Sequence, residues 1–323
     1  MRVVSLFSGC GGLDLGLIRA GHRVVWANDI LEDACETYRR NIGDHIYCGD
    51  ITKVDFAAIP KCDVVVGGFP CQGFSIANMN RREDDPRNRL YRQFLRALRE
   101  IQPKYFFAEN VRGILSLEKG AVFKKILRDF EATGYVVQYR LFNVAEFGVP
   151  QNRYRVILFG TRSDLPYAAP FDIPPTHGKG RAPFKSIGEA LKNIPEPDAP
   201  HSLTNHVCSQ YKLKHTGFIN HRPVDPNKPA PTVTARGDTK GGAMINHHPN
   251  NRRRLSVRET AVIQSFPNSF EFVGNMTSCY MQIGNAVPPK FGEVLGKFLK
   301  DIASKRKFSN DVRRSVKEQY PLF

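Results

Sequence analysis

The first half of the chain alternates short apolar runs with stretches of helical periodicity. Apolar runs that suit buried strands occupy residues 3–7, 24–28, 46–49, 64–69, 105–108, 136–142 and 155–160. Patterns that suit amphipathic helices lie between them, at residues 13–20, 31–41, 90–101 and 121–133. Strands that alternate with helices are typical of a parallel sheet covered by helices. The pattern therefore predicts a doubly wound α/β domain.

The pattern changes after Arg162. Residues 164–250 are rich in Pro, Gly, His and Asn and have little periodicity, which indicates a loop-rich inserted unit. Apolar positions within it argue against a disordered linker; they are Phe171, Ile187, Leu191, Ile194, Val233 and Ile245. Periodic sequence returns at residues 256–264 and 289–303, and a basic tail follows from residue 304. We therefore predict a large domain of residues 1–165 plus 278–323, and a smaller domain of residues 166–277.

Composition narrows the class of protein. The 323 residues include 47 Lys and Arg against 31 Asp and Glu, and the net charge of +16 suits a polyanionic partner, although many basic proteins bind no nucleic acid. No apolar run approaches the roughly 20 residues that span a bilayer, and the N-terminus does not resemble a signal peptide, so we expect a cytoplasmic protein without a membrane partner. The seven cysteines are scattered and form no Cys-x-x-Cys pair, which disfavours a disulfide framework or a zinc site.

A glycine-rich turn, Phe-Ser-Gly-Cys-Gly-Gly at residues 7–12, connects the first strand to the first helix. Glycines there let backbone N–H groups approach a ligand, although such turns also serve tight packing. Asp29 and Asp50 each follow a strand, where a carboxylate can bind ribose hydroxyls or read an adenine amino group. Either aspartate could instead cap a helix. Because both acids end strands after a glycine turn, the pattern favours a nucleotide-like cofactor.

Cys71 lies just beyond the carboxyl end of the strand at residues 64–69. In a doubly wound sheet of strand order 3-2-1-4-5, this fourth strand and the first flank the point where ligands bind. A lone cysteine in such a turn is more often a buried thiol. Glu109, however, follows the adjacent strand, and Arg153 and Arg155 lie where a later strand begins, so a thiol, a carboxyl and two guanidiniums would share one cleft. The arginines could equally be ordinary charges at a sheet edge.

Taken together, these residues resemble the DNA (cytosine-5) methyltransferase family, especially the bacterial modification enzymes of restriction-modification systems. The resemblance covers nearly the whole chain outside residues 165–245. Its motifs occur in the family's order, at residues 7–12, 28–29, 49–50, 68–75, 109–111, 151–155, 254–267 and 282–288. Asp29 stands where the family often has Glu, and Asn88 where Gly is frequent, both minor departures. The resemblance implies a Rossmann-like methyltransferase domain that binds S-adenosyl-L-methionine, with a smaller target-recognition domain.

The resemblance also implies a mechanism that needs no metal. Cys71 would add as a thiolate to carbon 6 of a flipped-out cytosine, and Glu109 would protonate ring nitrogen 3 or donate a hydrogen bond to it. Arg155, together with Arg153, would hold the base oxygen and Glu109. The residues implied to bind the cofactor are Phe7, Ser8, Gly9, Gly11, Gly12, Leu13, Asp29, Ile30, Asp50, Ile51, Phe69, Pro70, Leu90, Asn285 and Ala286.

Double-stranded DNA is the implied partner, and the loop at residues 72–87 would close over the flipped base. The arginines at residues 252–254 could contact bases or phosphates, or form a solvated face. Because residues 165–250 form a short region, we expect one short recognition sequence. The resemblance further implies a monomer that protects host DNA from a cognate restriction endonuclease. The residues expected to contact DNA are Gln72, Ser75, Arg87, Thr232, Val233 and Arg236.

Three other classes of protein compete with this interpretation. A tRNA cytosine-5 methyltransferase has the same catalytic frame, but that subgroup carries a Cys-Phe-Thr tripeptide, which this chain lacks. Enzymes that methylate amino groups of bases carry an Asp/Asn-Pro-Pro-aromatic tetrapeptide, which the Pro-Pro pairs at residues 174–175 and 288–289 do not match. A regulator that only binds DNA or cofactor has no need of Cys71, Glu109 or Arg155.

Overall fold

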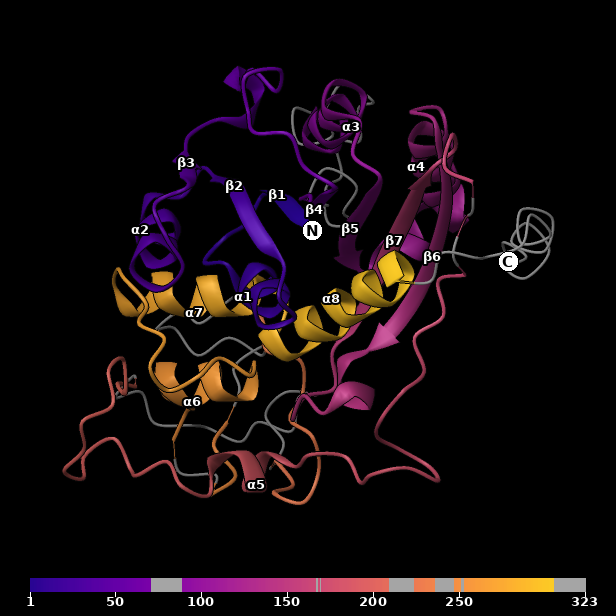
Figure 1. The fold of residues 1–323 in the computed structure, drawn as a ribbon. Coiled ribbons are helices and arrows are strands. Elements are labelled where there is room, and N and C mark those ends of the chain that lie inside the picture. The colour runs from indigo at the N-terminus through magenta and orange to yellow at the C-terminus, as the bar shows by residue number, and fades with distance from the viewer. Residues whose placement is uncertain are drawn as a thin grey trace.

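The computed structural model describes residues 1–70, 89–166, 168, 170–208, 224–235, 247–250 and 253–304. Its centre is a seven-stranded sheet of strand order β3-β2-β1-β4-β5-β7-β6 (Figure 1). The strands are β1 (Arg2–Leu6), β2 (Arg23–Asp29), β3 (Ile46–Cys48), β4 (Val64–Gly68), β5 (Tyr105–Val111), β6 (Tyr135–Asn143) and β7 (Tyr154–Arg162). All seven predicted strands are present, and the predicted order 3-2-1-4-5 is confirmed.

The strands β1 to β5 are parallel, whereas β7 runs antiparallel to both of its neighbours, β5 and β6. Parallel strands are buried on both faces, so their sequences are nearly continuous apolar runs. The valines at residues 64–66 in β4, for example, are fully buried. Because β7 is reversed, it begins at the edge where β1, β2, β4 and β5 end. The sheet therefore places the glycine turn, Asp29, Glu109 and Arg155 along one edge.

Helices cover both faces of the sheet. One face packs against α1 (Gly12–Arg19), α2 (Glu32–Asn41) and α8 (Pro289–Ser304), and the other against α3 (Arg89–Ile101) and α4 (Ala121–Glu131). The helices α1 and α8 cross at glycines, since a Cβ on Gly16 would lie 2.3 Å from the Pro289 carbonyl oxygen. The helices on this face of the sheet therefore come from both ends of the described chain.

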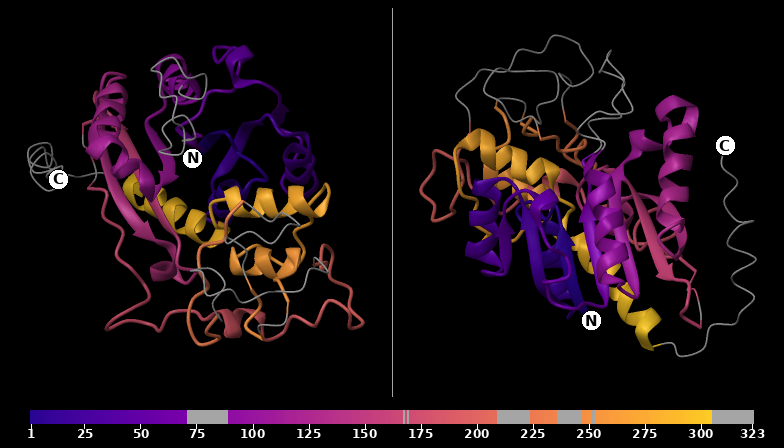
Figure 2. Two further views of the ribbon diagram at one scale, coloured as in Figure 1. Left: turned by 180° about the vertical axis from the view of Figure 1, so that it is seen from behind. Right: turned by 90° about the horizontal axis from the view of Figure 1, so that it is seen from above.

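A third apolar core is formed by buried residues of α5 (Ile187–Leu191), α6 (Val257–Ile263) and α7 (Met276–Asn285). Figure 2 shows long loops around these helices. Of the apolar positions predicted to fold, Ile187, Leu191 and Val233 are buried in this core. Phe171 instead packs in the core of the sheet against Phe107. Short 3-10 helices complete the elements cited below; they are η1 (Ile51–Lys53), η4 (Arg112–Leu115), η5 (Leu117–Gly120) and η6 (Val144–Phe147).

None of the helices in the described part of the chain has both the length and the apolar character that a bilayer span requires. Ile245 and the basic tail after Ser304 lie outside the described residues.

Candidate active site

The glycine turn after β1 leaves open space in front of its backbone. Phe7, Gly9 and Gly11 have φ angles of 53°, 54° and 88°, in the left-handed region that favours glycine. A Cβ on Gly11 would lie 2.2 Å from the Ile42 side chain, so this position needs glycine for packing, whereas a Cβ on Gly9 would meet nothing within 4 Å. The turn is thus tightly packed on one side and open at Gly9, as the binding of a ligand against its backbone requires.

Asp29 ends β2 and is bonded to the turn. Its Oδ2 accepts a hydrogen bond from the Gly9 backbone N–H at 2.8 Å, and its Oδ1 accepts one from the Leu31 N–H at 3.0 Å. Burial raises the pKa of Asp29, and these two N–H groups partly offset that rise. The neighbouring Ile30 side chain is 65% exposed. A fixed carboxylate beside an exposed aliphatic side chain fits the ribose and the base of an adenosyl group.

Asp50 follows β3 and caps η1, because its side chain accepts a hydrogen bond from the Thr52 N–H at 2.9 Å. This bond lowers the pKa of Asp50. Asp50 therefore caps a helix, which was the alternative that the sequence left open. Its half-exposed carboxylate keeps further lone pairs for a ligand. Ile51 is buried beside it.

The chain returns to the turn at the end of α7. A Cβ on Gly12 would lie 3.0 Å from the Ala286 Cβ and 2.4 Å from the Val287 carbonyl oxygen, so the segment after α7 lies directly against the turn. Asn285 is exposed there, as its expected cofactor role requires. Leu13 is buried in the sheet core, so only its backbone is left to contact a ligand. Phe69 is also buried, and Leu90 packs against the same core as Phe69.

Glu109 and Arg155 form an ion pair at the same edge of the sheet. The Arg155 Nε lies 2.7 Å from Glu109 Oε1, and the two side chains are only 11% and 13% exposed. Glu109 pairs with Ile157 across the β5–β7 ladder, so Arg155, two residues before Ile157, projects from the same face. Burial lowers the pKa of Arg155, and the nearby Glu109 carboxylate opposes that effect. The predicted contact between these two residues is confirmed.

Gly68 makes room for the carboxylate on the other side. It pairs with Glu109 in the parallel β4–β5 ladder, and a Cβ at Gly68 would lie 2.9 Å from Glu109 Oε2. Asn110 is buried, and its amide Nδ2 donates to the Phe69 carbonyl oxygen at 3.1 Å. Asn110 therefore fixes the end of β4, which leads into residue 71. Neither role was predicted, although both residues lie within motifs that the sequence displays.

Several predicted residues lie outside the described part of the chain. They are Cys71, Gln72, Ser75, Arg87 and Arg236. Pro70, the last described residue before Cys71, follows Phe69 directly at the carboxyl end of β4.

Arg153 does not contact Glu109, which corrects its predicted position. It is 1% exposed, and its guanidinium donates to the carbonyl oxygens of Val233, Gly284 and Ala286 at 2.7, 2.7 and 3.1 Å. Burial and the positive charge of Arg155 lower the pKa of Arg153. The prediction was wrong because β7 begins only at Tyr154, so strand alternation does not extend back to residue 153.

The expected DNA contacts near residue 232 are also revised. Thr232 is half-buried, and its Oγ1 donates to the Asn152 carbonyl oxygen at 2.6 Å. Val233 is 1% exposed and belongs to the third core, so its side chain packs inside the protein and does not line a surface.

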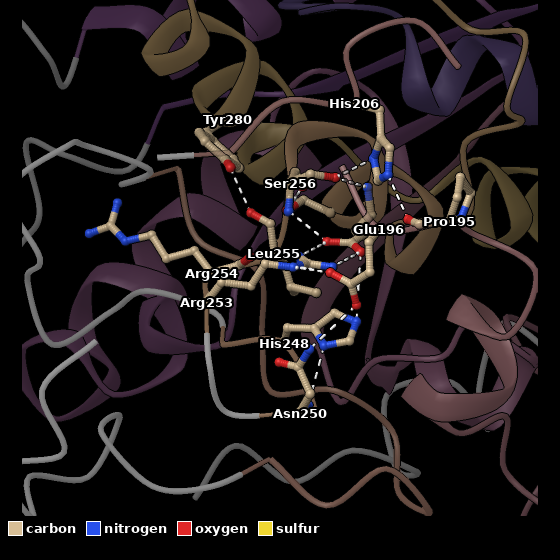
Figure 3. A network of polar contacts seen from close by, with 12 residues as sticks. Pro195, Glu196, His206, His248, Asn250, Arg253, Arg254, Leu255, Ser256 and Tyr280 are labelled. Atoms are coloured by element: carbon tan, nitrogen blue, oxygen red, sulfur yellow. Dashed lines mark hydrogen bonds and ion pairs between the residues drawn. The ribbon is translucent and has the colours of Figure 1, made fainter. Parts of the chain in front are cut away.

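Arg253, one of the arginines offered as a phosphate contact, is engaged within the protein (Figure 3). Its Nη1 and Nη2 donate to the two carboxylate oxygens of Glu259 at 2.7 and 2.8 Å, and its Nε donates to Glu196 at 2.7 Å. Glu259 is 1% exposed and also accepts from the Ser256 N–H, which completes a capping box at the start of α6. Arg254 is 2% exposed. Arg253 therefore links Glu196 to the start of α6 within the small region.

The fold and the site together define a class of protein. A doubly wound sheet presents a nucleotide-type turn and two strand-end aspartates at the same edge as a buried carboxylate–guanidinium pair. That arrangement belongs to an α/β enzyme which holds a nucleotide-like cofactor beside its catalytic groups.

Comparisons with known proteins specify this class. The family model for C-5 cytosine-specific DNA methylases matches residues 1–301. The chain is 39% identical over 346 residues to the Type II methyltransferase M.NgoFVII of Neisseria gonorrhoeae, covering 98% of this chain and 91% of that protein. It is 34% identical to M.FnuDI of Fusobacterium nucleatum, covering 98% and 99%. The chain therefore belongs to the C-5 cytosine-specific DNA methylase family and is an S-adenosylmethionine-dependent DNA (cytosine-5) methyltransferase.

Two solved structures show the same fold. A putative DNA modification methyltransferase encoded within an E. coli prophage matches with a TM-score of 0.73 at 24% identity, covering 94% of this chain and all (100%) of that one. The S. pombe Dnmt2 methyltransferase matches with a TM-score of 0.71 at 21% identity, covering 94% and 99%.

Proposed function

We propose that this enzyme methylates carbon 5 of a flipped-out cytosine in a short duplex DNA sequence through a covalent adduct with Cys71. The observation that carries the proposal is the buried Glu109–Arg155 pair on β5 and β7, beside the end of β4 that leads directly to Cys71. A flipped base bound there would meet an acid and a guanidinium that are already in place.

Each residue has a defined chemical task. The Cys71 thiolate would form a bond to carbon 6, while Glu109 delivers a proton to ring nitrogen 3, so that negative charge does not build up on the ring. Arg155 would hold the carboxyl of Glu109 and donate to the base oxygen. When bound, S-adenosylmethionine supplies an electrophilic methyl group. Loss of the carbon 5 proton to a base, return of the nitrogen 3 proton to Glu109 and expulsion of the Cys71 thiolate would then restore the aromatic ring.

The residues of the cofactor end have positioning tasks. Asp29 would accept hydrogen bonds from ribose hydroxyls, and Phe7 and Ile30 would contact the adenine ring. Gly9 would allow the backbone to approach the ligand, since nothing stands within 4 Å of its absent Cβ. The chain's homologues are Type II methyltransferases, so we also propose that methylation protects cytoplasmic host DNA from a cognate endonuclease.

The test is the substitution Cys71→Ser, with Cys62→Ser as the matched control. Cys62 lies two residues before the start of β4. Burial raises the pKa of its thiol to about 12 and so disfavours the reactive thiolate. We expect Cys71→Ser to lower methylation of duplex DNA by on the order of 10³-fold or more while leaving DNA binding intact. Cys62→Ser should retain activity. Near-normal turnover by Cys71→Ser would overturn the covalent mechanism.

Two further measurements separate the competing classes. The wild-type enzyme should form a covalent adduct with duplex DNA that contains 5-fluorocytosine, whereas a protein that only binds DNA would form none. Duplex DNA should accept methyl groups and tRNA should not; the reverse preference would refute the DNA assignment of the site. Bisulfite sequencing of DNA from cells that express the protein will identify the recognised sequence.

A further inference from the structure

The segment at residues 230–234 is fastened to the chain just before β7. The Ala230 N–H donates to the Pro150 carbonyl oxygen at 2.9 Å, and the Asn152 N–H donates to the Ala230 carbonyl oxygen at 2.8 Å. The Val233 N–H donates to the Gln151 side-chain oxygen at 2.8 Å, and the Val233 carbonyl accepts from Arg153. We call residues 230–234 the recognition segment, because they include Thr232 and Val233, which the family resemblance implies lie beside the DNA target.

The same two side chains also reach the cofactor end. Arg153 donates to the Gly284 and Ala286 carbonyl oxygens through Nη2. Gln151 donates to the Gln264 side-chain oxygen at 2.6 Å, and Gln264 in turn donates to the Ile283 and Ala286 carbonyl oxygens at 2.7 and 3.2 Å. Two sets of hydrogen bonds, one through Arg153 and one through Gln151 and Gln264, therefore connect the recognition segment with residues 283–286. The last of these, Ala286, lies against the glycine turn.

The junction between the two segments is fully buried. Gln151, Arg153 and Gln264 are 0%, 1% and 0% exposed. A Cβ on Gly284 would lie 2.3 Å from the carbonyl oxygen of Thr234, so the backbones of the two segments are in direct contact. A buried polar network is costly when any member loses its partner, so such networks tend to shift as a unit. Neither segment can move alone without leaving a buried guanidinium or amide unpaired.

We propose that Arg153 is a positioning residue that couples cofactor binding at residues 285–286 to the placement of the recognition segment. The inference rests on the proposed function, because it takes residues 230–234 to lie beside the DNA target. Its physical content is reciprocal: whatever cofactor binding does to the affinity for cognate DNA, DNA does to the affinity for cofactor by the same factor. Arg153 itself touches neither reacting group.

The experiment measures this coupling directly, without turnover. Titration calorimetry would give the dissociation constant of S-adenosylhomocysteine, the reaction product, with and without a short duplex carrying the sequence mapped by bisulfite sequencing. We expect the duplex to tighten product binding by roughly tenfold in the wild type. Arg153→Lys keeps the charge but cannot serve three carbonyls in the fixed geometry of a guanidinium. In the Arg153→Lys variant, the dissociation constants of S-adenosylhomocysteine with and without the duplex should differ by less than about twofold.

The matched control is Arg140→Lys on the neighbouring strand β6. Arg140 also donates to a backbone carbonyl, that of Ile173 at 3.1 Å, but its contacts lie away from the junction. It should keep the coupling of the wild type. If Arg153→Lys does not fold, Gly284→Ala tests the same junction through its contact with Thr234, and it should relax the choice of methylated sequence in bisulfite maps.

The outcomes are distinguishable. A folded Arg153→Lys variant with unchanged coupling would overturn the inference, and so would a wild type that methylates DNA but shows no coupling. An unchanged sequence preference in Gly284→Ala would count against it as well. A wild type that methylates no duplex DNA would instead refute the proposed function.

Discussion

The buried carboxyl of Asp14 in α1 offers a quantitative test of the structure. It is fully buried, and it accepts hydrogen bonds from the Ser5 hydroxyl at 2.7 Å and the Tyr38 hydroxyl at 2.9 Å. The Cys10 thiol is close enough for the Asp14 charge to raise its pKa, and the Tyr38 hydroxyl also lies 3.1 Å from His45 Nε2. Burial raises the pKa of Asp14 from 3.8 to about 6, although both hydroxyls oppose the rise.

The raised pKa sets the sign of the pH dependence. Between pH 3.8 and about 6 the folded protein holds a proton on Asp14 that the unfolded chain has lost, so this group makes stability fall as pH rises. The rise in the pKa of Asp14 from 3.8 to about 6 corresponds to a free-energy difference of about 3 kcal/mol. This penalty is absent below pH 3.8 and complete above about pH 6.

The substitution Asp14→Asn removes the titration while keeping the shape of the side chain. Its amide cannot accept both hydroxyl protons, which adds a cost of about 1–2 kcal/mol that does not depend on pH. The difference in free energy of unfolding, variant minus wild type, should therefore rise by about 2.5 kcal/mol between pH 4 and pH 7. Urea unfolding across that range measures it.

The control is Asp63→Asn, which should show the opposite slope. Partial burial raises the pKa of Asp63, but hydrogen bonds from Lys104 and from the Arg2 N–H outweigh burial and lower it overall. Asp63 therefore adds stability above its unfolded pKa, and the variant should fall behind the wild type as pH rises. A pH-independent difference for Asp14→Asn would refute the assignment of a neutral carboxyl to this site.

Two further predictions concern the site and the small region. Arg253→Met removes both guanidinium hydrogen bonds to the buried Glu259 carboxylate, and should lower the free energy of unfolding by about 3–5 kcal/mol in urea titrations; a loss under about 1 kcal/mol would contradict the network of Figure 3. Gly68→Ala places a Cβ 2.9 Å from Glu109 Oε2, and should lower kcat by about tenfold with cofactor affinity unchanged. Gly113→Ala, in open space after β5, is its control; equal kcat values for the two variants would contradict the assigned role of Gly68.

The sequence predicts the sheet well because its strands are strongly apolar. Buried parallel strands have near-continuous hydrophobic runs. The short edge strand β3 was also predicted from its apolar residues, although Tyr47 in it is exposed. The antiparallel insertion of β7 between β5 and β6 could not be predicted, since pairing partners depend on contacts across the whole sheet. The helix α7 was also missed. Its sequence carries Thr277, Ser278 and Gly284, which weaken helical propensity, and the N-cap Asn275 was the remaining signal.

The residues of the site were also predicted correctly in the regular part of the chain and wrongly in the irregular part. Glu109 and Arg155 were identified because strand ends in an α/β sheet gather at one edge, a rule that needs only the order of elements. Arg153 and Val233 were misassigned because the chain around them is irregular. Without a period of 2 or 3.6 residues, the sequence does not separate side chains that point inward from those that point outward.

The buried arginines show why net charge overstates the surface available for DNA. Loops leave carbonyl groups without the partners that a sheet or helix supplies, and a buried carbonyl must still be paired. A guanidinium offers five donors in a fixed plane and can satisfy several carbonyls at once. Arg153 does so for Val233, Gly284 and Ala286.

Arg258 fills the same role in α6. It is fully buried, and it donates to the carbonyl oxygens of Thr204, Pro267 and Phe270 at 3.0, 3.1 and 2.7 Å. These arginines count toward the net charge of +16, yet no phosphate can reach their guanidiniums in this structure. Because each neutralised phosphate contributes about −0.9 to the slope of log K against log salt concentration, the slope for DNA binding reports only the arginines and lysines left at the surface. In this loop-rich region, arginine stabilises the fold as well as supplying charge for the substrate.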